Sequence, residues 1–157
     1  MNACTNLCQT LRAASLPLSG TYIVLLWLPA AQRLAIGRRG QGHFPRGYYT
    51  YTGSAKRALT ARLHRHLHGA STHHWHLDYF RPYAQVLAWQ AYGGDRQPEC
   101  QLNQRLAHWG QVVMAKFGAS DCSCPAHLLY YPRRALAMHA LYDIAKDSVY
   151  QSLVKEG

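Results

Sequence analysis

Apolar runs and helical patterns alternate along the chain and predict strands interleaved with helices. The run Gly20–Leu28 is rich in β-forming residues and ends at Pro29, which predicts a buried strand. Tyr48–Thr52 predicts another strand, in which Tyr49 and Tyr51 lie on one face because side chains alternate with a period of two. Shorter strands are expected at Arg33–Gly37, Val86–Tyr92 and Leu128–Tyr131.

Helical spacing marks several segments between these strands. Leucines at every fourth position from Leu59 to Leu67 predict a helix that follows Gly53 and Ser54, with Ser54 as its N-cap, and ends near His68. Further helices are expected at Asn6–Ala14, Glu99–Trp109 and Arg133–Lys155, the last an amphipathic C-terminal helix (133–155) with Met138, Leu141, Ala145, Val149 and Leu153 on its apolar face. Two irregular stretches are expected at Arg38–Gly47 and Ser71–Tyr83. Strands and helices in this order predict an α/β or α+β domain.

Length and charge narrow the function classes. At 157 residues, with no evident linker or repeat, the chain is expected to form one domain over residues 1–157. It carries 17 Lys and Arg against 7 Asp and Glu, a net charge of +10, and its first acid is Asp78. This scarcity excludes an enzyme that binds several metals through acidic residues in its first half. The excess of positive charge favours a polyanionic partner, nucleic acid first, although such charge can also serve solubility alone.

The sequence carries no pattern of export or membrane insertion. Residues 1–20 contain neither a basic segment nor a long apolar run, so no secretory signal is expected there. The apolar run Tyr22–Leu28 is far shorter than the roughly 20 residues that a membrane-spanning helix needs. Five cysteines, an odd number, fit reduced thiols. We therefore expect a cytoplasmic protein with no membrane contact.

Three motifs follow one another in a specific order. They are Gly20-Thr-Tyr22 in the first strand, Tyr51-Thr-Gly53 in the second and Arg62-Leu-His-Arg-His66 on the next helix, followed by Glu99 at the start of a later helix. This order resembles the GIY-YIG nuclease superfamily, with Thr21 and Thr52 in place of its two isoleucines. The phrases FPRGYYTYTGSA, WHLDY and FGASDCSCPAHL look like an uncharacterised branch of it. The resemblance covers a nuclease core at residues 18–131 and implies a small, mainly antiparallel central sheet flanked by helices.

The resemblance implies a divalent-metal-dependent endonuclease that hydrolyses duplex, branched or single-stranded DNA in repair or processing. Such cleavage needs an activated water and stabilised charge on the phosphate oxygens. Mg²⁺ or Mn²⁺ can bind through one carboxylate and fill its shell with water and phosphate, and Glu99 is the predicted ligand. Arg62 is the predicted bidentate phosphate partner. His66, four residues later on the same helical face, can orient the phosphate or donate to it.

By the same resemblance, Tyr22 would deprotonate or position the water and Tyr51 would assist by a hydrogen bond. A phenol with a pKa of about 10 needs a nearby cation or metal to act as a base at pH 7. Each residue alone has an ordinary explanation: tyrosines favour strands, Arg62 and His66 could form a solvated helical face, and Glu99 could stabilise a helix N-terminus.

The ordered combination favours catalysis over these separate explanations. The alternative is a catalytically inactive nucleic-acid-binding module of the same fold, which the changed motif residues and their spacing would also fit. A zinc-stabilised interaction protein is a more distant third hypothesis.

Basic residues near the motifs are predicted to contact DNA: Arg38, Arg39, Arg46, Lys56, Arg57 and Arg65. Tyr22 and Tyr51 are 29 residues apart, whereas the superfamily usually has a short connection there. The stretch Arg33–Gly47 is therefore interpreted as an inserted strand and loop that could extend the DNA-binding face or shape the substrate entrance. The asparagine often found late in superfamily members has no obvious counterpart, and Asp121 is the closest polar candidate.

A second group of candidate ligands lies late in the chain. Cys122, Cys124 and His127 offer three metal ligands within six residues. A fourth for a structural zinc site could come from Cys100, His108 or Asp121. Because this spacing is not a common zinc-finger pattern, buried reduced thiols beside a packed histidine are the favoured interpretation.

Histidines and aromatic residues also gather in the stretch after the predicted helix that ends near His68. The group comprises His73, His74, Trp75, His76 and Tyr79. Such a stretch could contact bases or phosphates, with Asp78 orienting His76 or supporting the catalytic site. Packing of a loop by its aromatic side chains is an equally good explanation.

Overall fold

The computed structural model describes residues 3–94, 97–145 and 150–151 of the chain. A five-stranded sheet with strand order β6-β4-β1-β5-β7 forms its centre, and every neighbouring pair is antiparallel. The strands are β1 (Gly20–Leu28), β4 (Gly47–Ala55), β5 (Gln85–Gly93), β6 (Leu128–Tyr131) and β7 (Tyr150–Gln151). The predicted small, mainly antiparallel central sheet of a mixed α/β domain is confirmed.

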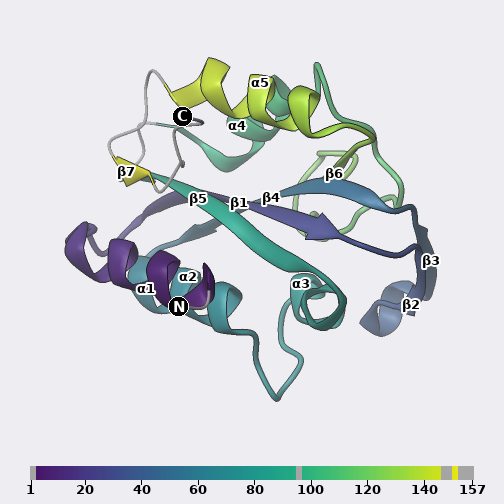
Figure 1. Cartoon of the computed structure of the whole chain (residues 1–157), viewed down its shortest axis with the longest axis horizontal. Helices are drawn as coiled ribbons and strands as arrows, with labels where there is room; N and C mark the ends of the chain where they lie inside the picture. Colours follow the sequence, from purple (N-terminus) through teal and green to yellow (C-terminus); the bar gives the residue numbers. More distant parts are fainter. Residues whose placement is uncertain (1–2, 95–96, 146–149, 152–157) are drawn as a thin grey trace.

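Helices cover both faces of this sheet (Figure 1). On one face lie α1 (Ala3–Ala13), α2 (Leu59–His68) and α3 (His76–Phe80), and on the other lie α4 (Glu99–Leu106) and α5 (Arg134–Ala145). Central strand β1 serves both layers: Val24 and Leu26 enter the core under α1 and α2, whereas Ile23 and Leu25 enter the core under α4 and α5. A strand buried on both faces needs a continuous apolar run, which explains its sequence.

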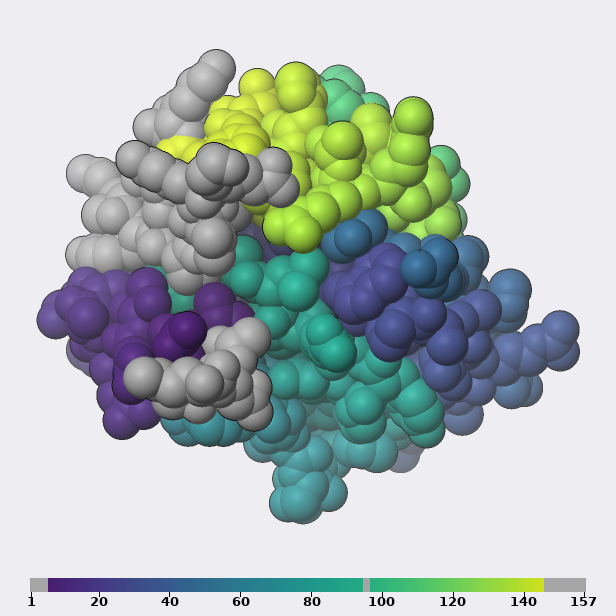
Figure 2. All heavy atoms as spheres, viewed as in Figure 1, coloured from purple at the N-terminus to yellow at the C-terminus, as the bar shows by residue number. Residues whose placement is uncertain are grey.

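The stretch between β1 and β4 forms a separate two-stranded hairpin. Strands β2 (Gln32–Ala35) and β3 (Gln41–Phe44) pair antiparallel and are joined through a 3₁₀ helix, Gly37–Arg39. It forms the blue projection at the right of Figure 2. The prediction of an irregular loop over 38–47 is therefore wrong at β3, where Phe44 is anchored in the core by edge contacts with Phe80 and Phe117.

Strand β4 runs three residues further than its sequence predicts. It continues through Gly53 and Ser54 to Ala55, and α2 begins at Leu59 after Ala58. Ser54 as an N-cap is therefore wrong, because it lies within β4 and its hydroxyl donates to Glu99 of α4. The leucine stripe of α2 is confirmed, since all three leucines are fully buried.

The C-terminal helix also differs from its prediction. Helix α5 ends at Ala145, and residues 150–151 form β7 beside β5, so a helix to Lys155 is wrong at that strand. Met138 and Leu141 are buried as expected, whereas Val149 and Leu153 lie outside the described residues. The stretch 71–83, expected to be irregular, contains α3 and a 3₁₀ helix at Arg81–Tyr83. Within the described part of the chain, no helix has both the length and the apolar character needed to cross a bilayer.

Candidate active site and the adjoining Cys/His cluster

The two motif tyrosines lie on one face at the same end of the sheet. Tyr22 on β1 is opposite Gly53 on β4, so Tyr51, two residues before Gly53, is its diagonal neighbour. Gly53 makes room for the Tyr22 ring, since a Cβ at that position would overlap with the phenol oxygen. Gly118, at φ +71°, does the same for Tyr51, whose ring would lie 2.8 Å from an added Cβ. Glycines therefore determine where both phenols lie.

Helix α2 brings Arg62 and His66 to these tyrosines. Nε2 of His66 lies 2.7 Å from the Tyr22 hydroxyl, and the histidine is only 1% exposed. Arg62 donates to the carbonyl oxygen of Ser54, and its guanidinium lies 4.3 Å from the centre of the Trp75 ring. His66 is thus held behind Tyr22, so its predicted direct contact with a phosphate is replaced by a contact with the phenol.

Glu99 reaches the same place from the opposite helical layer. It is the first residue of α4, where a carboxylate interacts favourably with the helix dipole. Its Oε2 accepts a hydrogen bond from Ser54 Oγ at 2.9 Å. Its Oε1 lies 3.0 Å from Nδ1 of His127. A carboxylate offers about four acceptor positions, so these two contacts leave room for a metal ion.

The face of β4 opposite the tyrosines lies toward α4 and α5 and carries hydroxyl side chains. Three hydroxyls on this face make hydrogen bonds: Thr50 with Tyr131 of β6 (3.0 Å), Thr52 with Asn103 of α4 (3.3 Å) and Ser54 with Glu99 of α4 (2.9 Å). Asn103 also donates to the Ala126 carbonyl at 2.6 Å. Strand β4 therefore carries Tyr51 and makes room for Tyr22 at Gly53 on one face, and holds Glu99 through Ser54 on the other. The alternation of tyrosine and hydroxyl residues in β4 is the sequence signal that could have identified Ser54.

Four of the five predicted catalytic residues line one cleft of about 780 Å³: Tyr22, Tyr51, Arg62 and Glu99. The fifth, His66, lies directly behind Tyr22. Asp121 adds a second, exposed carboxylate to the lining. Trp75 also lines the cleft and holds Arg62, a role that the sequence reasoning missed because the two residues come from different elements.

Burial controls the electrostatics of the tyrosine–histidine group. Desolvation raises the pKa of Tyr22 well above its usual range, Tyr51 adds to the rise, and Arg62 only partly opposes it. Burial likewise raises the pKa of Tyr51. It lowers the pKa of His66 to about 4, although Asp78 favours the charged form. All three side chains are therefore neutral at pH 7, and Tyr22 and His66 share a neutral hydrogen bond.

The basic residues predicted to contact DNA occupy different surroundings. Lys56 and Arg57 line the cleft, whereas Arg38 and Arg39 line an adjoining hollow of about 520 Å³. Arg46 precedes β4 and thus lies at the far end of that strand, with its guanidinium 5.1 Å from the centre of the Trp27 ring. One pair of cations therefore lines the cleft and a second pair lines the adjoining hollow, whereas Arg46 is remote from both.

Arg65 and Asp78 form an ion pair behind the cleft. Their charged atoms are 3.0 Å apart, and Asp78 also accepts hydrogen bonds from the backbone N–H groups of His74 and Trp75. These bonds lower the pKa of Asp78 against the opposing effect of burial. The sequence suggested that Asp78 could orient His76. In the structure, Asp78 instead fixes the start of α3. His76 accepts a hydrogen bond from the Gly118 backbone at 2.8 Å and lines the cleft.

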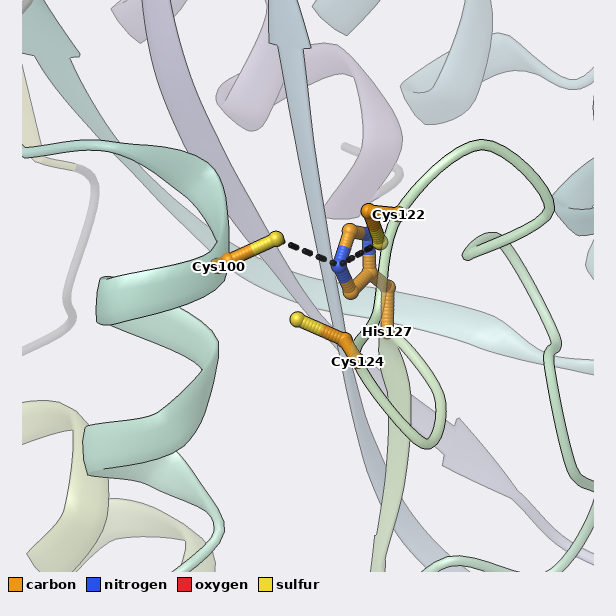
Figure 3. Close-up of side chains that lie close together, drawn as sticks. All are labelled: Cys100, Cys122, Cys124 and His127. Atoms are coloured by element: carbon orange, nitrogen blue, oxygen red, sulfur yellow. Dashed lines mark hydrogen bonds between the residues drawn. The ribbon is translucent and has the colours of Figure 1, made fainter.

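A Cys/His cluster lies on the other side of Glu99, formed by Cys100, Cys122, Cys124 and His127. Their potential ligand atoms all lie within 4.8 Å of one another. Figure 3 shows Cys100 extending from α4 toward His127, with the other two cysteines on the loop beside it. The cluster is compatible with a metal site. Of the three residues considered as a fourth ligand, Cys100, His108 and Asp121, it is Cys100 that lies with the other three.

The fold and site define a mixed α/β protein with an antiparallel sheet and a basic cleft built from tyrosine, arginine and glutamate. One protein-family model, described as "Domain of unknown function DUF123", matches residues 21–150, which include the cleft residues and the whole Cys/His cluster. The chain belongs to this family. No curated protein and no solved structure matches it. The relation to GIY-YIG nucleases stays a prediction from the motifs.

Proposed function

We propose that this protein is a divalent-metal-dependent endonuclease that hydrolyses DNA phosphodiester bonds in repair or processing. The observation that supports this most is the meeting of Tyr22, Tyr51, Arg62 and Glu99 around one cleft, although they come from four different elements. A net charge of +10 suits a polyanionic substrate. Chance placement of strand-forming tyrosines and a helix-starting glutamate would not bring them to one opening together with an arginine.

Arg62 is suited to hold the phosphate that is cleaved. Its fork of N–H groups matches two phosphate oxygens, and stacking on Trp75 together with its bond to the Ser54 carbonyl restricts its orientation. Lys56 and Arg57 line the same cleft and can neutralise neighbouring phosphates. The substrate backbone would thus be positioned by three cations before any bond breaks.

Glu99 is suited to hold Mg²⁺ or Mn²⁺. Mg²⁺ keeps several waters and needs only one or two carboxylates, and the open cleft leaves space for water beside Glu99 and Asp121. Such an ion, when bound, stabilises the charge that develops on the phosphate oxygens. Ser54 and His127 fix the carboxylate on its two oxygens, so Glu99 is oriented before it binds a ligand.

Tyr22 is suited to orient the attacking water through His66. When the Tyr22 hydroxyl donates a hydrogen bond to Nε2 of the neutral His66, the phenol oxygen presents a lone pair to the cleft. A water bound there donates a hydrogen bond to that oxygen and points its own lone pair toward the phosphate. As the water attacks phosphorus, it gives a proton to Tyr22 and Tyr22 passes its own proton to His66, while the bond from phosphorus to the leaving ester oxygen breaks. That oxygen would take a proton from solvent water in the open cleft, and His66, whose pKa is lowered by burial, would return its proton to solvent through Tyr22. Tyr51 borders the same space and limits where the water can lie.

A nicking assay tests this function. Purified protein is incubated with supercoiled plasmid, branched and single-stranded DNA, with and without Mg²⁺ or Mn²⁺. We expect metal-dependent cleavage that falls by at least about 100-fold in Glu99→Gln, a change that keeps the size of the side chain. Asp143→Asn on α5 makes the same chemical change away from the cleft and should cleave normally. Equal activity of the wild type and Glu99→Gln on all substrates would contradict the proposal, and DNA binding without cleavage would favour the inactive binding module.

A further inference from the structure

The Cys/His cluster has the composition and shape of a closed metal site. Three sulfurs and one imidazole converge, and a tetrahedral Zn²⁺ with Zn–S of about 2.3 Å and Zn–N of about 2.0 Å would separate its ligand atoms by roughly 3.5–3.8 Å. Nε2 of His127 lies 3.8 Å from Cys100 Sγ and 3.5 Å from Cys122 Sγ (Figure 3). These two distances lie in that range, and all four ligand atoms lie within 4.8 Å of one another.

The surroundings support a closed structural site. Cys124 and His127 are each 2% exposed, and the cluster joins two segments that are distant in sequence, the start of α4 and the loop 116–127. Lys116 on this loop donates to the carbonyl oxygens of Cys122 and Cys124, at 2.8 and 3.2 Å. Three thiolates and one Zn²⁺ carry a net negative charge, and the Lys116 ammonium lies close enough to offset it. Soft thiolates with one imidazole favour zinc over hard cations.

We propose that the Cys/His cluster binds one Zn²⁺ ion, which joins α4 to the loop 116–127 and positions Glu99. The link runs through His127. With Nε2 bound to zinc, its Nδ1 keeps the ring proton and faces Glu99 Oε1 at 3.0 Å. Within the described residues, no hydrogen bond to another group is found for this buried nitrogen, so Glu99 is the acceptor within reach of its proton. Ligand histidines commonly donate to a carboxylate in this way.

Zinc binding is tested on untagged, full-length protein by elemental analysis and by visible spectroscopy of the Co²⁺-exchanged form. We expect about one zinc per chain and the absorption bands of tetrahedral, thiolate-bound Co²⁺. Cys122→Ser should lose zinc. Cys8→Ser, which changes a second group of possible ligands formed by Cys8, His64 and His68, and His108→Gln should both keep it. A thiol-blocking reagent added to the wild type should release the zinc in step with thiol modification, so the test does not depend on folding of a variant. Wild type without zinc, or zinc lost in Cys8→Ser and kept in Cys122→Ser, would overturn the site.

The positioning of Glu99 rests on the proposed function and needs a separate variant. His127→Cys retains four zinc ligands but removes the imidazole that faces Glu99. We expect about one zinc per chain and a Mg²⁺ concentration for half-maximal nicking that rises about 10-fold or more. An unchanged Mg²⁺ dependence in a zinc-loaded His127→Cys protein would overturn the positioning role. If the wild type does not cut DNA, the endonuclease proposal fails while the zinc content still decides the metal site.

Discussion

The cleft and the Cys/His cluster meet at Glu99 but are built in opposite ways. The cleft is open and lined by oxygen and cationic groups, whereas the cluster draws three sulfurs and one imidazole within 4.8 Å. An open oxygen site suits a hard cation that keeps its waters and meets a substrate, and a closed sulfur site suits an ion that only holds the fold. The comparison shows that the Glu99 carboxylate can belong to both sites. Its Oε2 contacts Ser54 in the lining of the cleft, and its Oε1 faces His127 of the cluster.

Removing each metal ion in turn should have the largest effect and should distinguish the two sites. EDTA removes weakly held Mg²⁺ at once, so nicking should stop completely and return when Mg²⁺ is added, with no change in thermal midpoint. A thiol-blocking reagent should instead release zinc and lower the free energy of unfolding by about 4 kcal/mol, a shift of roughly 10 °C in the midpoint. Activity, zinc release and melting are measured on the same sample. Loss of stability in brief EDTA treatment would show that the two ions are not held differently.

Replacing Arg62 should affect the cleft alone. Arg62→Ala removes the group predicted to hold the phosphate, and we expect nicking to fall by about 10²–10³-fold. Arg62→Lys keeps the charge without the planar fork, so most of that loss should remain. Zinc content should stay the same in both variants. Arg105→Ala on α4 is the matched control, and its activity should be close to wild type. A fully active Arg62→Lys protein would show that charge alone suffices.

Acid should weaken the protein through His66, behind the cleft. Its pKa falls on folding from 6.5 to about 4, so below pH 6.5 the unfolded chain binds a proton that the folded chain does not take until about pH 4. The free energy of unfolding should therefore fall as pH drops through this window, by up to about 3 kcal/mol. Chemical denaturation from pH 7.5 to 4.5 measures the fall.

The His66→Gln variant isolates this effect. Its free energy of unfolding should change less with pH than that of the wild type between pH 7.5 and 4.5, because glutamine does not titrate. Protonation of the Cys/His cluster acts in both proteins and cancels in the difference. His108→Gln, at an exposed position, should follow the wild type. Equal slopes in wild type and His66→Gln would mean that His66 is not held neutral by burial.

Much of the fold could be predicted because burial leaves local patterns. The run of β1 and the leucines of α2 are periodic within single elements, so their structure follows from neighbouring residues. Strands β3 and β7 were missed because they are short and exist through partners elsewhere: Phe44 needs its aromatic neighbours, and β7 needs the edge of β5. Ser54 was assigned to a helix cap because its sequence context fits one, although β4 runs through it and its hydroxyl donates to Glu99.

The candidate site divides in the same way. The order of the motifs identified Tyr22, Tyr51, Arg62 and Glu99, and the structure brings these four to one cleft. What surrounds them could not be predicted, because it depends on how α4 packs against β4 and the loop 116–127. Cys100 was one of three candidates for the fourth ligand, and only that packing selects it. The contact between His127 and Glu99 has no local signature at all.

The smallest effect concerns the path of DNA across the cleft. On duplex DNA, each phosphate contact adds about 0.9 to the slope of log affinity against log salt. Replacing both Lys56 and Arg57 with alanine, in the Glu99→Gln background that leaves DNA intact, should therefore reduce the slope by about 1.8. Arg46→Ala, at the far end of β4, and the cluster variant His127→Cys should leave it unchanged. Binding measured by fluorescence anisotropy at several salt concentrations gives these slopes. An equal reduction in Arg46→Ala would place the DNA along the whole of β4 and remove the distinction between a cleft that binds phosphate and a remainder that does not.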